Sequence, residues 1–127
     1  MYSHLMVGSN DIARSKAFYD AIFTAAGAEP GFINPMGTIV YAHKDNVFLV
    51  TRPIDGQPAT HANGGTIGFA VDSPELIDAW HAAGIDHGGT TVESPPGWRD
   101  GSMGAFYSAY LRDPDGNKLC ALYRGEK

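Results

Sequence analysis

The stretch YLRDPDGNKLCAL, residues 110–122, is the most informative segment of this sequence. Its centre, DPDGN at 113–117, is made of residues that favour tight turns, and apolar residues that suit strands stand on both sides. Proline presets the backbone angle of a turn, and glycine accepts a positive φ. The segment therefore predicts a β-hairpin in the last part of the sequence.

The composition fits one compact domain with its own apolar core. The chain has 127 residues, a mass of 13.5 kDa and 43% apolar residues, a size at which folding buries a sizeable core. Its net charge is -5 and its acidic residues are dispersed. Because no cluster of Lys and Arg offers a surface to phosphates, we expect no nucleic-acid partner.

Cysteine content and the first residues indicate a compartment. The single cysteine, Cys120, excludes an intrachain disulfide and suits a reducing environment. The opening MYSHLMVGSND lacks the basic segment and the long apolar core of a signal peptide, and no run reaches membrane-spanning length. We therefore expect a cytoplasmic protein with no membrane partner.

The first half of the sequence combines one helix with several strands. Apolar residues recur at helical spacing over 11–26, after a capping Ser9 or Asn10 and before Gly27, which ends the helix. Shorter runs rich in β-branched and aromatic residues stand on either side. The expected elements are a strand at 2–8, a helix at 11–26, and a hairpin of strands 38–43 and 46–52.

The same organisation begins again after a linker at 53–65 that is rich in Gly, Pro, Asn and Thr. A helix starts at Ser73, whose side chain caps it while proline takes the first helical position, and it ends at Gly84. The other expected elements are strands at 66–71, 85–92, 105–112 and 118–124, with a loop at 93–104.

The two halves look like a degenerate repeat of strand, helix and three strands. The helix-ending glycines, Gly27 and Gly84, are 57 residues apart, whereas Leu49 and Cys120 in the two last strands are 71 apart. The second half therefore carries 14 extra residues (71 - 57), which we expect mainly in the loop 93–104 and in the final turn.

The order of the elements predicts an α+β fold with helices outside and strands inside a mixed or antiparallel sheet. We expect a single domain over 1–127, with module one at about 1–53 and module two at about 64–127.

Two segments resemble a known family. The turn DPDGNK with the strand after it, and the opening SHLMVGSNDIARSKAFYDAIF, resemble the vicinal oxygen chelate superfamily, which contains glyoxalase I, bleomycin-resistance proteins and extradiol dioxygenases. The resemblance covers nearly the whole chain. It implies two tandem βαβββ modules that form a curled mixed sheet around a cavity, with one cavity per chain or one shared across a homodimer.

The resemblance also implies four metal positions, which fall at His4, Leu49, Thr66 and Cys120. Only His4 is the usual ligand type. A His4–Cys120 pair would suit zinc, and nickel, manganese or iron stay open, but two ligands make a weak site. We favour no cofactor, with His4 in a cavity wall and Cys120 as a buried apolar residue. Cys120 would become a nucleophile if His4 lay beside it and lowered its pKa.

The loop before strand 105–112 carries candidate ligand-binding residues. It is similar to a PPG-x-R segment of the family and places Trp98 and Arg99 near the cavity mouth, where an arginine beside an aromatic face would suit a carboxylate, a phosphate or a planar ring. The alternative is a surface arginine and a tryptophan that pins the loop. Strand alternation lets only one of Tyr107 and Tyr110 line the cavity, and we favour Tyr110, with Tyr41 unresolved.

These features support a small-molecule-binding protein of the glyoxalase/bleomycin resistance/dioxygenase superfamily with a degenerate metal site. The alternative is a glyoxalase-like, metal-dependent lyase or isomerase, so enzymatic activity stays open. A structural or interaction module would explain the missing ligands, but it would leave the Trp98–Arg99 loop without a role.

Overall fold

The computed structural model describes residues 1–127 as two successive modules. The elements of the first module are β1 (Leu5–Gly8), α1 (Ile12–Ala25), β2 (Phe32–Ile33), β3 (Ile39–His43) and β4 (Asn46–Thr51). Strands β1 and β4 are parallel neighbours, and β3 and β2 continue the sheet in the order β1-β4-β3-β2.

The second module repeats this plan with one additional strand. Its elements are β5 (Ile67–Ala70), α2 (Pro74–Asp86), β6 (Thr90–Thr91), β7 (Gly97–Gly101), β8 (Gly104–Arg112) and β9 (Lys118–Arg124). Its sheet has the order β5-β9-β8-β6, with β5 parallel to β9, and β7 also pairs with β8.

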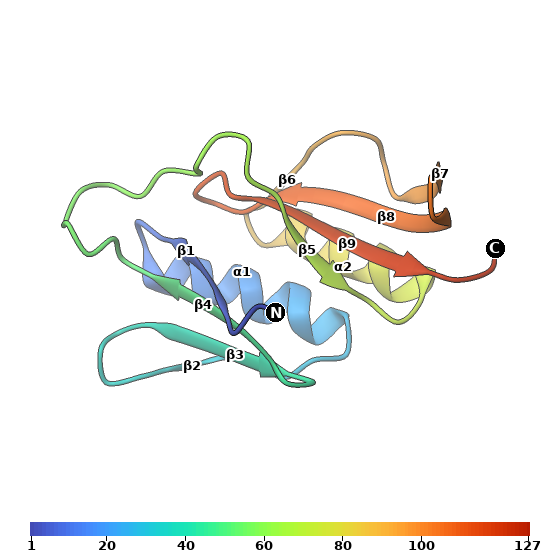
Figure 1. Cartoon of the computed structure of the whole chain (residues 1–127). Helices are drawn as coiled ribbons and strands as arrows, with labels where there is room; N and C mark the ends of the chain where they lie inside the picture. The colour runs from blue at the N-terminus through green and yellow to red at the C-terminus, as the bar shows by residue number, and fades with distance from the viewer.

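The two sheets lie on the same side of a helix layer in which α1 packs against α2 (Figure 1). The edge strands β1 and β5 do not pair, so the two mixed sheets stay separate and do not close into a barrel. This arrangement confirms the α+β expectation. Neither helix is long and apolar enough to span a membrane.

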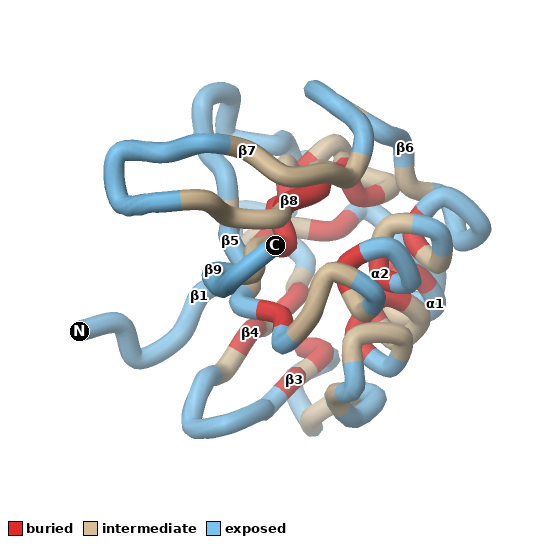
Figure 2. Tube along the Cα trace, turned by 90° about the vertical axis from the view of Figure 1, so that its right-hand side faces the viewer, coloured by how far each residue is buried: buried red, intermediate tan, exposed pale blue.

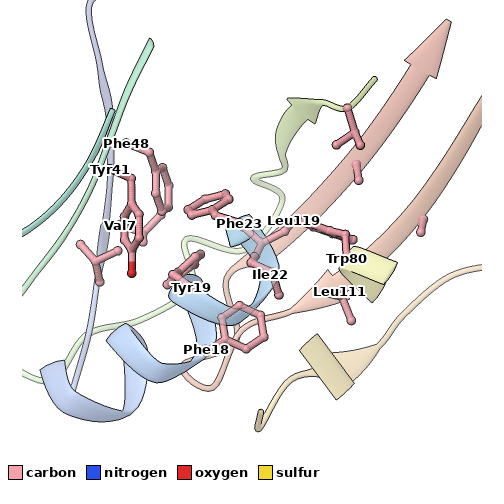
Figure 3. Close-up of a cluster of buried hydrophobic side chains, with 14 of the residues drawn as sticks. Val7, Phe18, Tyr19, Ile22, Phe23, Tyr41, Phe48, Trp80, Leu111 and Leu119 are labelled. Atoms are coloured by element: carbon pink, nitrogen blue, oxygen red, sulfur yellow. The ribbon is translucent and has the colours of Figure 1, made fainter. Parts of the chain in front are cut away.

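The core fills the space between the helices and the strands (Figure 2). Side chains of α1 occupy its middle, because Phe18, Tyr19 and Ile22 are fully buried between residues of both sheets (Figure 3). On α2, Ile77 and Trp80 are buried in the same way. One continuous core therefore joins the two modules.

The strand ladders give the register of the repeat. Met6 pairs with Leu49 in the first sheet, and Gly68 pairs with Cys120 in the second, so Leu49 and Cys120 are equivalent, as expected. Met6 and Gly68 are 62 residues apart, and Leu49 and Cys120 are 71 apart. The second module therefore has nine extra residues (71 - 62) between its first strand, β5, and its last, β9, and not the 14 that were expected.

The expected end of the second helix was wrong, and this caused the miscount. Gly84 lies inside α2, where it leaves room for Leu111, and the helix continues to Asp86. The glycine equivalent to Gly27 is Gly88, because their φ values are +94° and +95°. Both residues use the left-handed conformation that commonly follows a helix.

Three further expectations need correction. Asp11, and not Ser9 or Asn10, caps α1 by accepting a hydrogen bond from the Arg14 amide. The strand expected at 85–92 shrinks to β6, since α2 takes Ile85. The loop expected at 93–104 contains β7, which forms a hairpin with β8 and holds most of the extra residues.

The turn 113–117 docks against the first module. Asp115 accepts hydrogen bonds from the Asn10 amide at 3.1 Å and from Arg14 Nη2 at 2.8 Å, and Asn117 Nδ2 donates to the Gly8 carbonyl. The Tyr19 hydroxyl donates to Asp113 Oδ2 at 2.5 Å, in the buried interior. The last turn of the second module therefore packs against the start of the first module's helix.

We expect Tyr19→Phe to destabilise the protein by about 1–3 kcal/mol, because it leaves the buried Asp113 carboxyl without one hydrogen-bond donor. Tyr107→Phe is the matched control, since the Tyr107 hydroxyl donates to Asp78 at 2.6 Å at an exposed position. The control should cost no more than about 0.5 kcal/mol. Urea unfolding followed by circular dichroism measures both, and equal losses would contradict the proposed role of the buried contact.

Candidate functional site

Each sheet has a face turned away from the helices, which we call its open face. On the first sheet, strand pairing aligns four apolar residues in one row, Phe32, Val40, Leu49 and Met6, and the two end residues are 59% and 50% exposed. Their neighbours Ile39, Val50 and Val7 point to the core instead. The open face of the first sheet is therefore apolar.

The open face of the second sheet is more polar. Cys120 pairs with Tyr110, and Lys118 Nζ lies 5.3 Å from the centre of the Tyr110 ring. Lys118 also forms an ion pair with Glu93. The structure thus brings Cys120 and Tyr110 together, and it turns Tyr107 toward α2, where its hydroxyl meets Asp78.

Trp98 and Arg99 do not form the predicted pair. Trp98 packs edge-on against Tyr107, with ring centres 5.4 Å apart, so it lies on the side of α2. Arg99 pairs with Phe106 on the opposite side of β7, because successive residues of a strand alternate. Arg99 Nη2 donates to the Pro95 carbonyl at 2.8 Å. Trp98 therefore packs the β7–β8 hairpin against the rest of the protein. Arg99 lies on the same open face as Tyr110.

A cavity of about 620 Å³ lies between the modules, next to the edge strands β1 and β5. His4 and Thr66 line it, whereas Leu49, Tyr110, Arg99 and Cys120 do not. Most of its lining is apolar, and this part includes Phe23, Tyr41, Phe48, Phe69, Val71 and Trp80. The volume is within the range of small-molecule sites, which are about 300–1,000 Å³.

No sequence pattern indicated that core aromatic residues would line a cavity. Phe23, Phe48 and Phe69 carry ordinary strand or helix periodicity, and their rings pack edge-to-face with centres 5.1–5.8 Å apart. Tyr41, the unresolved candidate, is buried, and its hydroxyl donates to Asp20 at 2.7 Å. Only the relative placement of the two modules reveals that these side chains border open space.

The four positions implied by the family resemblance do not fit a divalent metal. Leu49 has no donor atom, and the neutral Thr66 hydroxyl is a poor ligand. His4 Nδ1 already shares a 2.7 Å hydrogen bond with Ser3 Oγ. No group of three or more His, Cys, Asp or Glu side chains is placed to hold a metal ion. These side chains therefore do not form a site for a catalytic divalent metal.

Cys120 is placed as a buried thiol and not as an activated one. Burial raises the pKa of the Cys120 thiol and the charge of Glu93 acts in the same direction, although a hydrogen bond with Tyr110 opposes them. Since the thiolate is the reactive form, this environment keeps Cys120 unreactive near neutral pH.

An α+β chain of two strand-helix-strand modules, with unclosed sheets and a cavity between the modules, matches the architecture that the resemblance implied. The chain belongs to the glyoxalase/bleomycin resistance protein/dioxygenase superfamily, whose family model matches residues 2–121. The search of curated proteins found no match.

Solved structures agree with this assignment. A glyoxalase/bleomycin resistance protein from Albidiferax ferrireducens T118 is 58% identical, with a TM-score of 0.94 over 98% of this chain and 99% of that one. A family enzyme from Burkholderia phytofirmans PsJN is 19% identical, with a TM-score of 0.71 over 95% and 96%. Lactoylglutathione lyase from Agrobacterium tumefaciens is 20% identical, with a TM-score of 0.65 over 97% and 92%. The last two likenesses show the fold alone.

We expect Cys120 to react slowly with iodoacetamide in the folded protein at pH 7.5, because its side chain is 6% exposed and its pKa is raised. It is the sole cysteine, so the mass of the intact protein reports on it alone. The same protein in urea is the control and should react quickly. Equal rates in the two conditions would show an accessible, activated thiol instead.

Proposed function

We propose that this protein binds a small organic molecule in the cavity between its modules. The cavity itself carries the proposal, since it combines a suitable volume with mainly apolar walls and with a few polar groups, including His4 and Thr66, at its edge. Such a site holds a ligand by burying its apolar surface, while the polar groups orient it. This proposal does not require catalysis.

The lost metal positions favour binding over metal chemistry. A Lewis-acid mechanism needs several protein ligands and a group that moves a proton. Here Leu49 replaces a ligand, and the Cys120 thiol stays protonated near neutral pH. A metal-dependent lyase or isomerase is therefore the weaker candidate, with the likeness to lactoylglutathione lyase supporting a shared fold.

A thermal-shift screen of small organic metabolites tests the proposal, because a ligand selective for the folded state raises the melting temperature. We expect at least one compound to stabilise the wild type but not Phe69→Ala. Phe69 lines the cavity and packs against the core, on the side of β5 opposite to the open face that Gly68 shares with Cys120. Ala79→Phe changes an exposed position of α2, outside the cavity, and should keep the response.

Two results would count against this reading. The first is a hit whose effect survives in Phe69→Ala but disappears in Arg99→Ala, which would place the ligand on the open face of the second sheet. The second is stoichiometric metal, found by elemental analysis of protein purified without added metal and absent from His4→Ala. That result would restore the metalloenzyme alternative.

A homodimer is the second part of the proposal. In the apolar row on the open face of the first sheet, Phe32 is 59% exposed and Met6 is 50% exposed. Members of this superfamily often dimerise. A second copy that covers this row would bury these side chains.

Light scattering after size exclusion tests the dimer. We expect the wild type to have twice the chain mass at micromolar concentration and Met6→Lys to shift toward the single-chain mass, because a charge in an apolar interface is costly. Met36→Lys is the matched control, since Met36 is exposed outside the row. A monomeric wild type, or a Met6→Lys variant that stays dimeric, would contradict this proposal.

A further inference from the structure

Four places in the chain join an asparagine or an aspartate to a following glycine. Glycine has no side chain to shield its amide nitrogen, so this nitrogen can attack the carbonyl carbon of the side chain before it. The attack needs a free amide nitrogen and a free side chain, so the fold decides which pair reacts. The four pairs are Asp55–Gly56, Asn63–Gly64, Asp100–Gly101 and Asp115–Gly116.

The pair Asp115–Gly116 is held on both sides by hydrogen bonds. The Asp115 side chain is 1% exposed, and its carboxylate accepts from the Asn10 amide and from Arg14 Nη2. The Gly116 amide donates to the Asp113 carbonyl at 2.9 Å. Neither reacting group is therefore free while this turn stays folded.

The other two aspartate pairs are also restrained. The Asp55 carboxylate accepts from the Gln57 amide at 2.9 Å, and the Gly56 amide donates to the Pro53 carbonyl at 3.1 Å. The pair Asp100–Gly101 lies in the ladder between β7 and β8, which fixes its backbone in an extended form. An ionised carboxylate is in addition a poorer electrophile than an asparagine amide.

The pair Asn63–Gly64 has both reacting groups free. It forms the middle of a turn that is closed by a 2.9 Å hydrogen bond from the Gly65 amide to the Ala62 carbonyl, and the Gly64 amide itself has no acceptor. All four residues of the turn are exposed. A Cβ added at Gly64 would meet nothing within 4 Å, so the peptide unit has room to rotate toward the Asn63 side chain.

The conformation of this turn explains why glycine follows the asparagine. The φ of Gly64 is +99°, whereas Asn63 is not among the residues with positive φ, as in a type II turn, whose third residue is normally glycine. The chain has four other asparagines, each with a hydrogen-bonded side chain and with a larger residue after it: Asn10, Asn34, Asn46 and Asn117.

We propose that Asn63 is a site of spontaneous deamidation in the folded protein. The Gly64 nitrogen loses its proton and forms a bond to Cγ of Asn63, while the bond from Cγ to Nδ2 breaks and ammonia leaves. Water then opens the five-membered imide at either carbonyl, which gives aspartate or isoaspartate. The net change exchanges ammonia for water, so it needs no oxidant, reductant or cofactor.

The modification places a new negative charge beside the cavity. The turn is followed directly by Thr66, which lines the cavity, and then by β5. None of the four turn residues contributes to the core, so the modified chain keeps its packing. The isoaspartate product also routes the backbone through Cβ of residue 63 and lengthens the turn by one atom.

Incubation of the full-length protein at 37 °C and pH 7.5, followed by peptide mapping with mass spectrometry, tests the proposal. We expect Asn63 to deamidate in the folded protein at a rate within about threefold of that in guanidinium chloride, because its turn needs no unfolding to react. Asp115 should isomerise at least about tenfold more slowly in the folded protein than in guanidinium chloride, since its turn must open first.

Two variants connect the mass change to this residue. Asn63→Gln should lose the mass increase, because its amide would have to close a less favourable six-membered ring. Asn46→Gln is the matched control, since Asn46 is also exposed but precedes a valine, and it should keep the wild-type rate. Asn63→Asp carries the charge of one product and should keep the wild-type melting temperature.

Two results would overturn the proposal. One is an Asn63 that stays intact in the folded protein while it deamidates in guanidinium chloride, which would show that the turn protects it. The other is an equal mass increase in the wild type and in Asn63→Gln, which would place the reaction elsewhere. Neither result depends on whether the cavity binds a ligand.

Discussion

The buried contact between Tyr19 and the turn 113–117 is the constraint on which the rest of the structure depends. The Tyr19 hydroxyl and the Asn117 side chain both donate to Asp113 Oδ2, at 2.5 and 2.8 Å, so the carboxyl group sits in the interior with its acceptors in use. Burial still raises the pKa of Asp113. A carboxyl group in this position is costly without its donors, which fixes α1 relative to the second sheet.

This fixed placement explains why the cavity exists. The β8–β9 turn holds one side of the interface between the modules, and the packing of α1 on α2 continues it. On the equivalent side, the two-residue turn at Lys44 and Asp45 supplies no buried side chain. The two modules therefore pack closely at the β8–β9 turn and leave a cavity at the β3–β4 turn. The aromatic residues at the border of the two modules line this cavity.

Local sequence patterns predicted much of this fold. The DPDGN turn and the Ser73–Pro74 helix start are signals carried by a few neighbouring residues, and both appear where expected. Gly84 misled the prediction because a buried helix glycine that makes room for Leu111 has the same local sequence as a helix end. That distinction depends on a contact between distant segments, which no local pattern contains.

The candidate site was less accessible to sequence reasoning. The equivalence of Leu49 and Cys120 was predicted correctly, and Tyr107 and Tyr110 do point to opposite faces. Tyr110 was expected in the cavity wall, but it lies on the open face of the second sheet, outside the cavity. Trp98 and Arg99 were expected to act together, but alternation along β7 sends them to opposite faces. The expected residues therefore lie in three different places: the cavity, the open faces of the sheets and the contact of the β7–β8 hairpin with the rest of the protein. Which place each residue takes depends on strand direction and on how the modules pack, and neither can be read from the sequence.

The most direct test of the central claim is a crystal structure of the protein grown with 1-bromonaphthalene, located by the anomalous signal of its bromine. Binding between the modules predicts a bromine peak in the cavity bordered by Phe23, Phe48 and Phe69. A peak confined to the open face of the second sheet, beside Tyr110 and Arg99, would contradict the account.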